Sequence, residues 1–190
     1  MKIAIGMPTY GTIRTNTVHS LLKMVKKLPC EYNLLTQTGS YIQSNREEIV
    51  KMAKKLDCTH LLFVDHDMIF ESKAVEKLIN HNKDIIGADY NLRKLPLEST
   101  IKRADPNGAE IWVEHPNGLV ECCAVGMGFT LINLLVFDHI PHPWFFLEPD
   151  KDGSIKYGED MWFCRKAREA GYKIWCDLTA KVQHMGDYTY

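Results

Sequence analysis

The sequence predicts an α/β fold with a mostly parallel central sheet flanked by helices and a small antiparallel extension. Two observations carry this prediction. In residues 1–90, short apolar runs alternate with amphipathic stretches, as in parallel strands joined by crossover helices. In residues 91–190, prolines and Pro-Asn-Gly turns separate short strand candidates, which indicates antiparallel strands and loops.

The first half contains four predicted strands and three predicted helices. We expect the strands at residues 2–7, where Pro8 ends the first, and at 31–35, 60–64 and 84–88. Residues 15–28, 44–56 and 72–80 carry apolar side chains at helical spacing. The middle helix opens with Ser44 and Glu47, three residues apart, which is the spacing of a capping box.

The second half predicts shorter elements around a long loop. Strands are expected at residues 110–114, 119–124, 172–176 and 180–184, and a helix at 159–170 that ends before Gly171. Residues 138–157 hold three prolines, so we expect a mobile loop there. Its part from Pro141 to Tyr157, with an exposed Trp144, is expected to order as a lid over a bound ligand.

Composition bounds the classes of protein to consider. The 190 residues include 23 Lys and Arg against 24 Asp and Glu, so the net charge of −1 removes the electrostatic case for nucleic-acid binding. No uncharged stretch reaches the roughly 20 residues of a membrane span. The six cysteines show no metal-finger spacing and no secretory signal precedes them, so we expect free thiols and a cytoplasmic protein. We expect one compact domain over residues 1–190.

The sharpest local feature is Asp65-His66-Asp67, at the end of the predicted strand 60–64. In open α/β sheets, ligands gather beyond the carboxyl ends of strands. Two carboxylates one residue apart can share a divalent cation that bridges the phosphates of a ligand. In the alternative interpretation, one aspartate caps a turn and the other is a solvated surface charge.

Weaker candidates follow along the chain. Glu159 and Asp160 begin a predicted helix. They are either catalytic carboxylates or simply negative charges favoured by the helix dipole at that end. His184 follows the last predicted strand and either completes a metal site or packs at the surface. Arg46 and Arg93 offer forked donors for phosphate or base, or are solvated. Gly126 and Gly128 permit close approach of the backbone to a ligand, or form a tight turn.

In this order, Asp65-x-Asp67, the Gly-x-Gly-Phe segment at 126–129, Glu159-Asp160 and His184 resemble the motifs of glycosyltransferases of the GT-A fold, family-2-type enzymes in particular. The resemblance runs from Met7 to His184. Its most specific part is the segment 158–171, in which a Glu-Asp pair opens a helix that a glycine closes. The resemblance implies a nucleotide-binding half over residues 1–90 and an acceptor-binding, catalytic half over 91–190.

The resemblance also implies an activity and roles for residues. The activity would be metal-dependent transfer of a sugar from a nucleotide-diphosphate sugar, expected to be a UDP-sugar, to a hydroxyl of a glycan or other acceptor, with inversion. Asp160, or else Glu159, would be the general base. Mn²⁺ or Mg²⁺ would be held by Asp67 and His184, with Asp65 reaching it through water. The residues implied to contact the nucleotide sugar are Pro8, Thr9, Tyr10, Arg46, Asp65, His66, Arg93, Gly126 and Gly128.

Three other classes of protein were compared with this interpretation. A phosphatase of the haloacid-dehalogenase type would use Asp65 as nucleophile and Asp67 as acid/base. In such phosphatases, however, the Asp-x-Asp motif lies near the start of the chain instead of at residue 65, and Thr or Val occupies the position that Ile69 has here. A nucleotidyltransferase would carry a glycine-rich basic loop after the first strand, which residues 6–11 lack. A non-catalytic nucleotide-sugar or glycan-binding module would keep Asp67 and His184 and need no base at Asp160.

Overall fold

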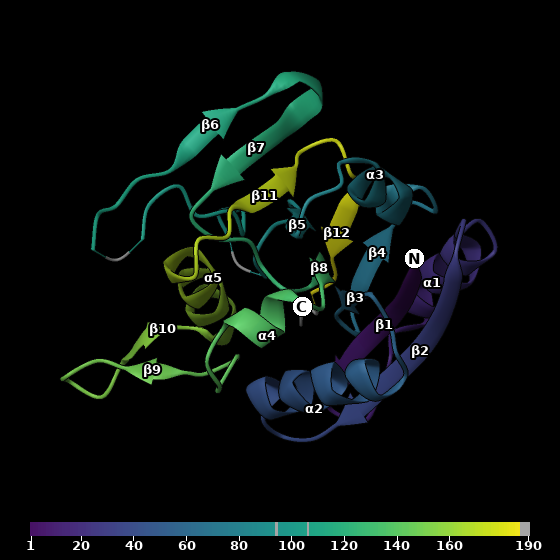
Figure 1. Ribbon diagram of the computed structural model, residues 1–190, viewed down its shortest axis with the longest axis horizontal. Coiled ribbons are helices and arrows are strands. Elements are labelled where there is room, and N and C mark those ends of the chain that lie inside the picture. The colour runs from purple at the N-terminus through teal and green to yellow at the C-terminus, as the bar shows by residue number, and fades with distance from the viewer. Residues whose placement is uncertain (94, 106, 187–190) are drawn as a thin grey trace.

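A computed structural model describes residues 1–93, 95–105 and 107–186. Its centre is an eight-stranded sheet with the strand order β2-β1-β3-β8-β5-β11-β7-β6 (Figure 1). The strands are β1 (Lys2–Thr9), β2 (Glu31–Thr38), β3 (His60–Val64), β5 (Ile85–Ala88), β6 (Trp112–Glu114), β7 (Leu119–Cys122), β8 (Phe129–Asn133) and β11 (Ile174–Asp177). Both halves of the chain therefore contribute strands to the same sheet.

Most strands of this sheet point in one direction. β1 is parallel to β2 and β3, and β5 is parallel to β11. β8 is inserted antiparallel between β3 and β5, and β7 lies antiparallel between β11 and β6. The predicted mostly parallel sheet with an antiparallel extension is confirmed, and β8 places one reversed strand at its centre.

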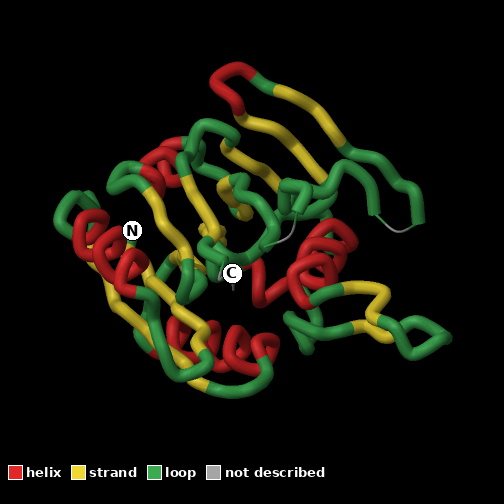
Figure 2. Tube along the Cα trace, turned by 180° about the vertical axis from the view of Figure 1, so that it is seen from behind, coloured by secondary structure: helices red, strands yellow, loops and turns green. Residues whose placement is uncertain are grey.

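Helices cover both faces of the sheet, as the view from behind also shows (Figure 2). The helices are α1 (Thr15–Val25), α2 (Ile42–Lys55), α3 (Ala74–Asn80), α4 (Val136–His139) and α5 (Glu159–Glu169), with a 3₁₀ turn at Pro116–Gly118. The buried side chains of α1 and α3 belong to one core cluster, and those of α2, α4 and α5 belong to the other. The sheet is thus the middle layer of three.

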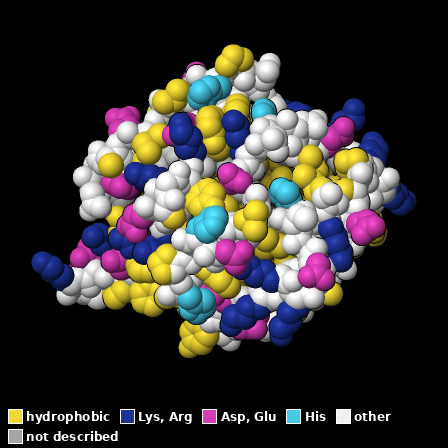
Figure 3. Space-filling model, in the orientation of Figure 1, with side chains coloured by type: hydrophobic (Ala, Val, Ile, Leu, Met, Phe, Trp, Pro, Cys, Tyr) yellow, Lys and Arg dark blue, Asp and Glu magenta, His cyan; other side chains and the backbone are white. Residues whose placement is uncertain are grey.

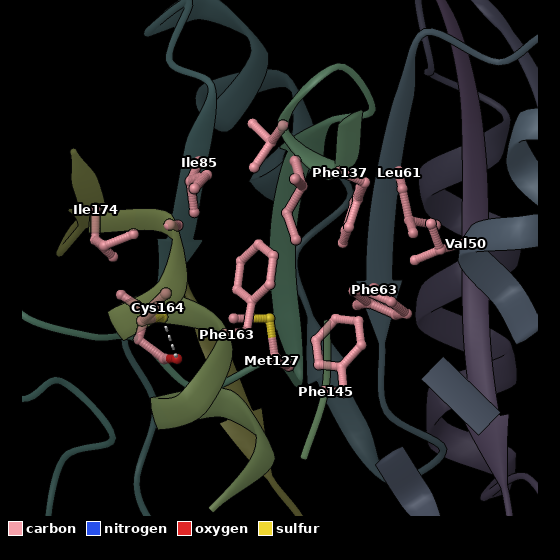
Figure 4. Close-up of a cluster of buried hydrophobic side chains, with 14 of the residues drawn as sticks. Val50, Leu61, Phe63, Ile85, Met127, Phe137, Phe145, Phe163, Cys164 and Ile174 are labelled. Atoms are coloured by element: carbon pink, nitrogen blue, oxygen red, sulfur yellow. Dashed lines mark hydrogen bonds between the residues drawn. The ribbon is translucent and has the colours of Figure 1, made fainter. Parts of the chain in front are cut away.

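The side chains of β3 show why its sequence is apolar throughout. Leu61 and Phe63 point into the core beneath α2 and α5, whereas Leu62 and Val64 point into the core beneath α1 and α3. A strand covered on both faces has no polar side to alternate with. Phe163 of α5 stacks on Phe145 with ring centroids 5.2 Å apart, beside Phe63 (Figure 4).

Two small antiparallel sheets lie outside the central one. β9 (Glu148–Pro149) pairs with β10 (Ile155–Tyr157), and β4 (Met68–Phe70) pairs with β12 (Val182–His184). In the second pair, His184 lies opposite Met68, and the Met185 N–H donates to the carbonyl of Asp67 at 2.9 Å. The strand predicted at residues 180–184 is confirmed as β12, and its partner β4 is a strand that the sequence did not predict.

The structure shifts the predicted ends of several elements, and two of these shifts bear on the site. β1 continues through Pro8 to Thr9, because β3 pairs with β1 only as far as Gly6 and Pro8 needs no N–H on that side. The capping box is wrong, since α2 begins at Ile42 and Ser44 lies inside it.

Glu47, the expected capping-box partner, has another role. Its carboxylate accepts the N–H of Phe145 at 2.8 Å and lies 2.7 Å from Nε2 of His142. It therefore connects α2 to the segment that follows α4. The Glu47 carboxylate thus accepts the N–H of Phe145, which is distant in sequence, instead of a backbone N–H at the start of its own helix.

The segment expected as a mobile loop contains the β9–β10 hairpin and a well-packed beginning. The indole N–H of Trp144 donates to the carbonyls of Phe137 and Ile140 at 3.1 and 3.2 Å, and Trp144 is half-buried. Phe145 beside it is 2% exposed. The expectation of an exposed Trp144 is therefore wrong, because the aromatic core anchors this end of the segment.

The remaining expectations concern charge, thiols and membranes. Lys and Arg side chains are interspersed with Asp and Glu on the face that Figure 3 shows. The six cysteines are free thiols, and all but Cys30 are buried. In the part of the chain that the structure describes, no helix is long and apolar enough to cross a membrane.

Candidate active site at the carboxyl ends of the strands

The loop Asp65-His66-Asp67 is held by hydrogen bonds from both sides. The N–H of Asp65 donates to the carbonyl of Gly128 at 3.0 Å. The carbonyl of His66 accepts the Arg14 N–H at 2.9 Å and the Thr17 hydroxyl at 3.0 Å. Because these partners belong to the start of β8 and to the beginning of α1, the two aspartates point in directions that the fold determines.

Asp67 is buried among cationic and imidazole groups. It is 1% exposed, with Oδ2 at 2.8 Å from Nη2 of Arg93 and Oδ1 at 3.4 Å from Nε2 of His184. Burial alone would raise the pKa of Asp67, but the neighbouring His184, Arg93 and His66 outweigh burial and lower it. The carboxylate is therefore ionised at neutral pH.

The pair Asp67 and His184 has the chemistry of two metal ligands. Nδ1 of His184 lies 3.3 Å from the carbonyl of Asn91, and Nε2 is the ring nitrogen that faces Asp67. Oδ1 of Asp67 and Nε2 of His184 are buried without a hydrogen-bond partner among the described residues, whereas Oδ2 of Asp67 forms an ion pair with Arg93. Imidazole and carboxylate both suit Mn²⁺, so the pair fits a divalent ion.

Asp65 is not part of that pair. Its Oδ1 accepts a hydrogen bond from Nη2 of Arg46 at 3.0 Å. Within residues 1–93, 95–105 and 107–186, no three His, Cys, Asp or Glu side chains are arranged to hold a metal ion. Asp67 and His184 are therefore the two side chains that could bind an ion directly, and its other ligands would have to be oxygens of a bound molecule or water.

Arg46 joins the two acidic motifs. It is 2% exposed, and its guanidinium donates to Oδ1 of Asp65 at 3.0 Å and to Oε1 of Glu159 at 3.4 Å. The guanidinium carbon also lies 5.1 Å from the ring centroid of Phe63. Burial opposes the charge of Arg46, yet the carboxylates of Asp65 and Glu159 raise its pKa further above the ordinary value. Arg46 is a permanent cation between β3 and α5.

The N-terminus of α5 carries Glu159 and Asp160. The helix dipole favours carboxylates in this first turn. Asp160 is half-buried and its Oδ1 accepts the Met161 N–H at 2.7 Å. Burial, followed by the negative charge of Glu159, raises the pKa of Asp160 to about 6, although the Met161 N–H and Arg46 act in the opposite direction. A carboxylate with this pKa can accept a proton near neutral pH.

Tyr90 is a site residue that the sequence reasoning missed. It is 7% exposed, its hydroxyl accepts the Gly128 N–H at 2.7 Å, and its ring meets His184 edge-on with centroids 5.6 Å apart. Burial and the nearby charge of Asp65 raise its pKa well above the ordinary value, so the hydroxyl stays protonated. Its place just after β5, at the same sheet edge as Asp65, was the signal that could have found it.

Tyr90 also explains the two glycines of the segment 126–129. A Cβ on Gly128 would lie 2.6 Å from the Tyr90 hydroxyl and 3.1 Å from Oδ2 of Asp65, and a Cβ on Gly126 would meet the same hydroxyl. These glycines therefore allow Tyr90 and Asp65 to lie against the backbone that precedes β8.

The end of β1 lies beside this site. Pro8 and Thr9 are buried, and the Thr9 hydroxyl shares a hydrogen bond with Thr38 at 3.0 Å. Tyr10 is 58% exposed, and its ring lies edge-on to His66 with centroids 5.8 Å apart. Of these sequence-predicted contacts, Tyr10 and His66 are the pair that offers aromatic surface.

Comparison with known proteins bears on the fold. No family model matches the sequence, and no curated protein matches it. Among solved structures, A197 from STIV is similar with a TM-score of 0.69 at 22% identity, over 98% of this chain and 87% of that one. The inositol-1-phosphate CTP transferase from T. maritima is similar with a TM-score of 0.54 at 10% identity, over 97% of this chain and 89% of that one. The chain therefore shares the fold of these two structures, and the predicted α/β fold class is confirmed.

We predict that Arg46→Met destabilises the protein by about 3 kcal/mol at pH 7, because two poorly solvated carboxylates lose their shared cation. Urea unfolding of the variant and of the unchanged protein measures the difference. The triple variant Arg46→Met, Asp65→Asn, Glu159→Gln is the control and should recover most of the loss. Equal losses in the single and triple variants would contradict an electrostatic role for Arg46.

We predict that Asp160→Asn stabilises the protein at pH 7 by on the order of 1 kcal/mol and has no effect near pH 4. Because the pKa of Asp160 in the folded protein, about 6, exceeds the unfolded value, its ionisation lowers the stability of the unchanged protein as pH rises from about 4 to 6. Asparagine has no such ionisation and keeps the acceptor for Met161. Urea unfolding at pH 4, 5, 6 and 7 measures this; a pH-independent difference would show that the pKa is not raised.

Proposed function

We propose that this protein is a glycosyltransferase that moves a sugar from a nucleotide-diphosphate sugar to a hydroxyl acceptor with the help of a divalent cation. The observation that carries the proposal is the arrangement around Arg46. On one side lies the loop with Asp65 and Asp67, the latter paired with His184; on the other lies Asp160, whose pKa is about 6. Arg46 thus lies between a site that suits a phosphate-bound cation and a carboxylate that can accept a proton.

The donor would bind at the carboxyl ends of β1 and β3. The exposed ring of Tyr10 beside His66 offers a stacking surface for the nucleobase. Asp67 and His184 would hold Mn²⁺ or Mg²⁺, which would neutralise charge on the departing diphosphate. Arg93, within 2.8 Å of Asp67, would lie close enough to contact phosphate. A uridine nucleotide is our expectation from the resemblance alone.

The acceptor hydroxyl would be deprotonated by Asp160. Its raised pKa suits a general base near neutral pH, whereas Glu159 is engaged by Arg46. Asp160 therefore fits the role better than Glu159. When a base deprotonates the acceptor hydroxyl, the acceptor oxygen attacks the anomeric carbon directly and the configuration is inverted. The proposal therefore includes no covalent sugar intermediate.

The other classes of protein are less well supported. A phosphatase needs a free carboxylate nucleophile, but Oδ1 of Asp65 is bound by Arg46. The T. maritima structure is named as a CTP transferase, and a nucleotidyl transfer would release pyrophosphate instead of nucleoside diphosphate. A binding module would not need a proton acceptor with the pKa of Asp160. The released product separates these classes.

We predict that UDP-sugars stabilise the protein in a thermal-shift assay only when Mn²⁺ is present. A ligand at about 100 times its Kd should stabilise the folded state by about 2.7 kcal/mol. Asp67→Asn should abolish the Mn²⁺-dependent part, because it removes the anionic ligand, and His184→Ala should weaken it less. Persistence of the full Mn²⁺ effect in Asp67→Asn would overturn the assignment of the metal site.

We predict that Asp160→Asn lowers turnover by about 10²–10⁴-fold while donor Kd stays within about twofold, since this is the usual contribution of general acid–base catalysis. Turnover is followed by release of nucleoside diphosphate in the presence of a glycan acceptor, and donor Kd by calorimetry. Lost donor binding would make Asp160 a phosphate or metal residue. Unchanged turnover would assign the base to Glu159 or argue for a retaining reaction.

A further inference from the structure

The side chain of Arg93 occupies the place where a cation would sit on Asp67. Its Nη2 lies 2.8 Å from Oδ2 of Asp67, closer than His184 Nε2 is to Oδ1. The Asp67 side chain is 1% exposed, whereas that of Arg93 is 48% exposed. The carboxylate is thus a fixed, buried group, and the arginine reaches it from the solvent side.

The surroundings of Arg93 provide space for its guanidinium elsewhere. A cavity of about 540 Å³ is lined by Arg93, His184, Asn91, Leu97 and Gly186, among others. The Arg93 side chain is 48% exposed and lines this cavity, so its guanidinium has solvent-facing space beside Asp67.

We propose that Arg93 is a tethered counter-ion that competes with the divalent cation for Asp67 and moves onto the diphosphate when donor and metal bind. This inference rests on the proposed function. A divalent ion on Asp67 and His184 would face a guanidinium that shares the same carboxylate, and two cations at one buried carboxylate repel each other. Diphosphate oxygens offer the displaced guanidinium an anionic partner with the forked geometry that arginine prefers.

This arrangement makes donor and metal binding cooperative. Without nucleotide, the ion needs to displace Arg93 and finds no diphosphate to ligate it, so it binds weakly. With nucleotide, both cations have anionic partners and both bind. Each ligand therefore raises the affinity of the site for the other, as linkage requires.

The test uses Arg93→Met, which keeps the length of the stem and removes the charge. Titration with Mn²⁺ alone, followed by the electron paramagnetic resonance signal of the free ion, should show Mn²⁺ bound about two- to fivefold more tightly by the variant, the size of a half-exposed ion pair. Calorimetry with UDP at saturating Mn²⁺ should show UDP bound about tenfold more weakly by the variant. Effects of opposite sign distinguish competition from a general structural role.

Arg103→Met is the matched control. It likewise removes one positive charge, but the Arg103 guanidinium lies over the Trp112 ring at 4.0 Å and has no contact with Asp67, so both affinities should stay unchanged. Equal or weaker Mn²⁺ binding by Arg93→Met would overturn the competition while leaving the proposed function intact. Tighter Mn²⁺ binding with unchanged UDP affinity would overturn the contact with diphosphate. Failure of the unchanged protein to bind either Mn²⁺ or UDP would overturn the proposed function itself.

Discussion

The buried guanidinium of Arg46 is the interaction on which the candidate site depends. It comes from α2 and neutralises Asp65 after β3 and Glu159 at the start of α5. Two carboxylates drawn together at the edge of an apolar core would repel each other and lose hydration, so neither could lie where it does without a shared cation. The same cation lies over Phe63, whose ring belongs to the core beneath α2 and α5. Core packing and site electrostatics are therefore coupled at one side chain.

A second constraint joins two strands that lie far apart in the sequence, β4 and β12. The pairing of β4 with β12 sets His184 opposite Met68, and the backbone bond from Met185 to Asp67 continues that register by one residue. Because side chains alternate along a strand, a slip of one residue would turn His184 away from Asp67. Backbone pairing, and not attraction between the side chains, determines that these two groups meet.

The acidic residues of the site are given different pKa values by their neighbours. Asp67 has three cationic or imidazole neighbours and a lowered pKa, whereas Asp160 has a raised pKa because burial and Glu159 act on it together. Neighbouring carboxylates with pKa values pushed in opposite directions can divide charge stabilisation and proton transfer between them. Tyr90, protonated and bound to Gly128, lies against the backbone that connects these regions.

The sequence by itself determined the elements whose signals are local. Apolar periodicity predicted β3 at its full extent and α5 closely, and the run of acidic residues after β3 marked the sheet edge where the site lies. It did not determine β8 and β4, nor the end of β1 beyond Pro8, because their hydrogen bonds go to strands distant in the sequence. Only the tertiary structure decided that Glu47 contacts Phe145 instead of capping α2, that Asp65 faces Arg46, and that Arg93 covers Asp67. In each case one charged side chain had several possible partners in the sequence. The partner that it contacts depends on which parts of the chain are buried around it, and no local sequence pattern contains that information.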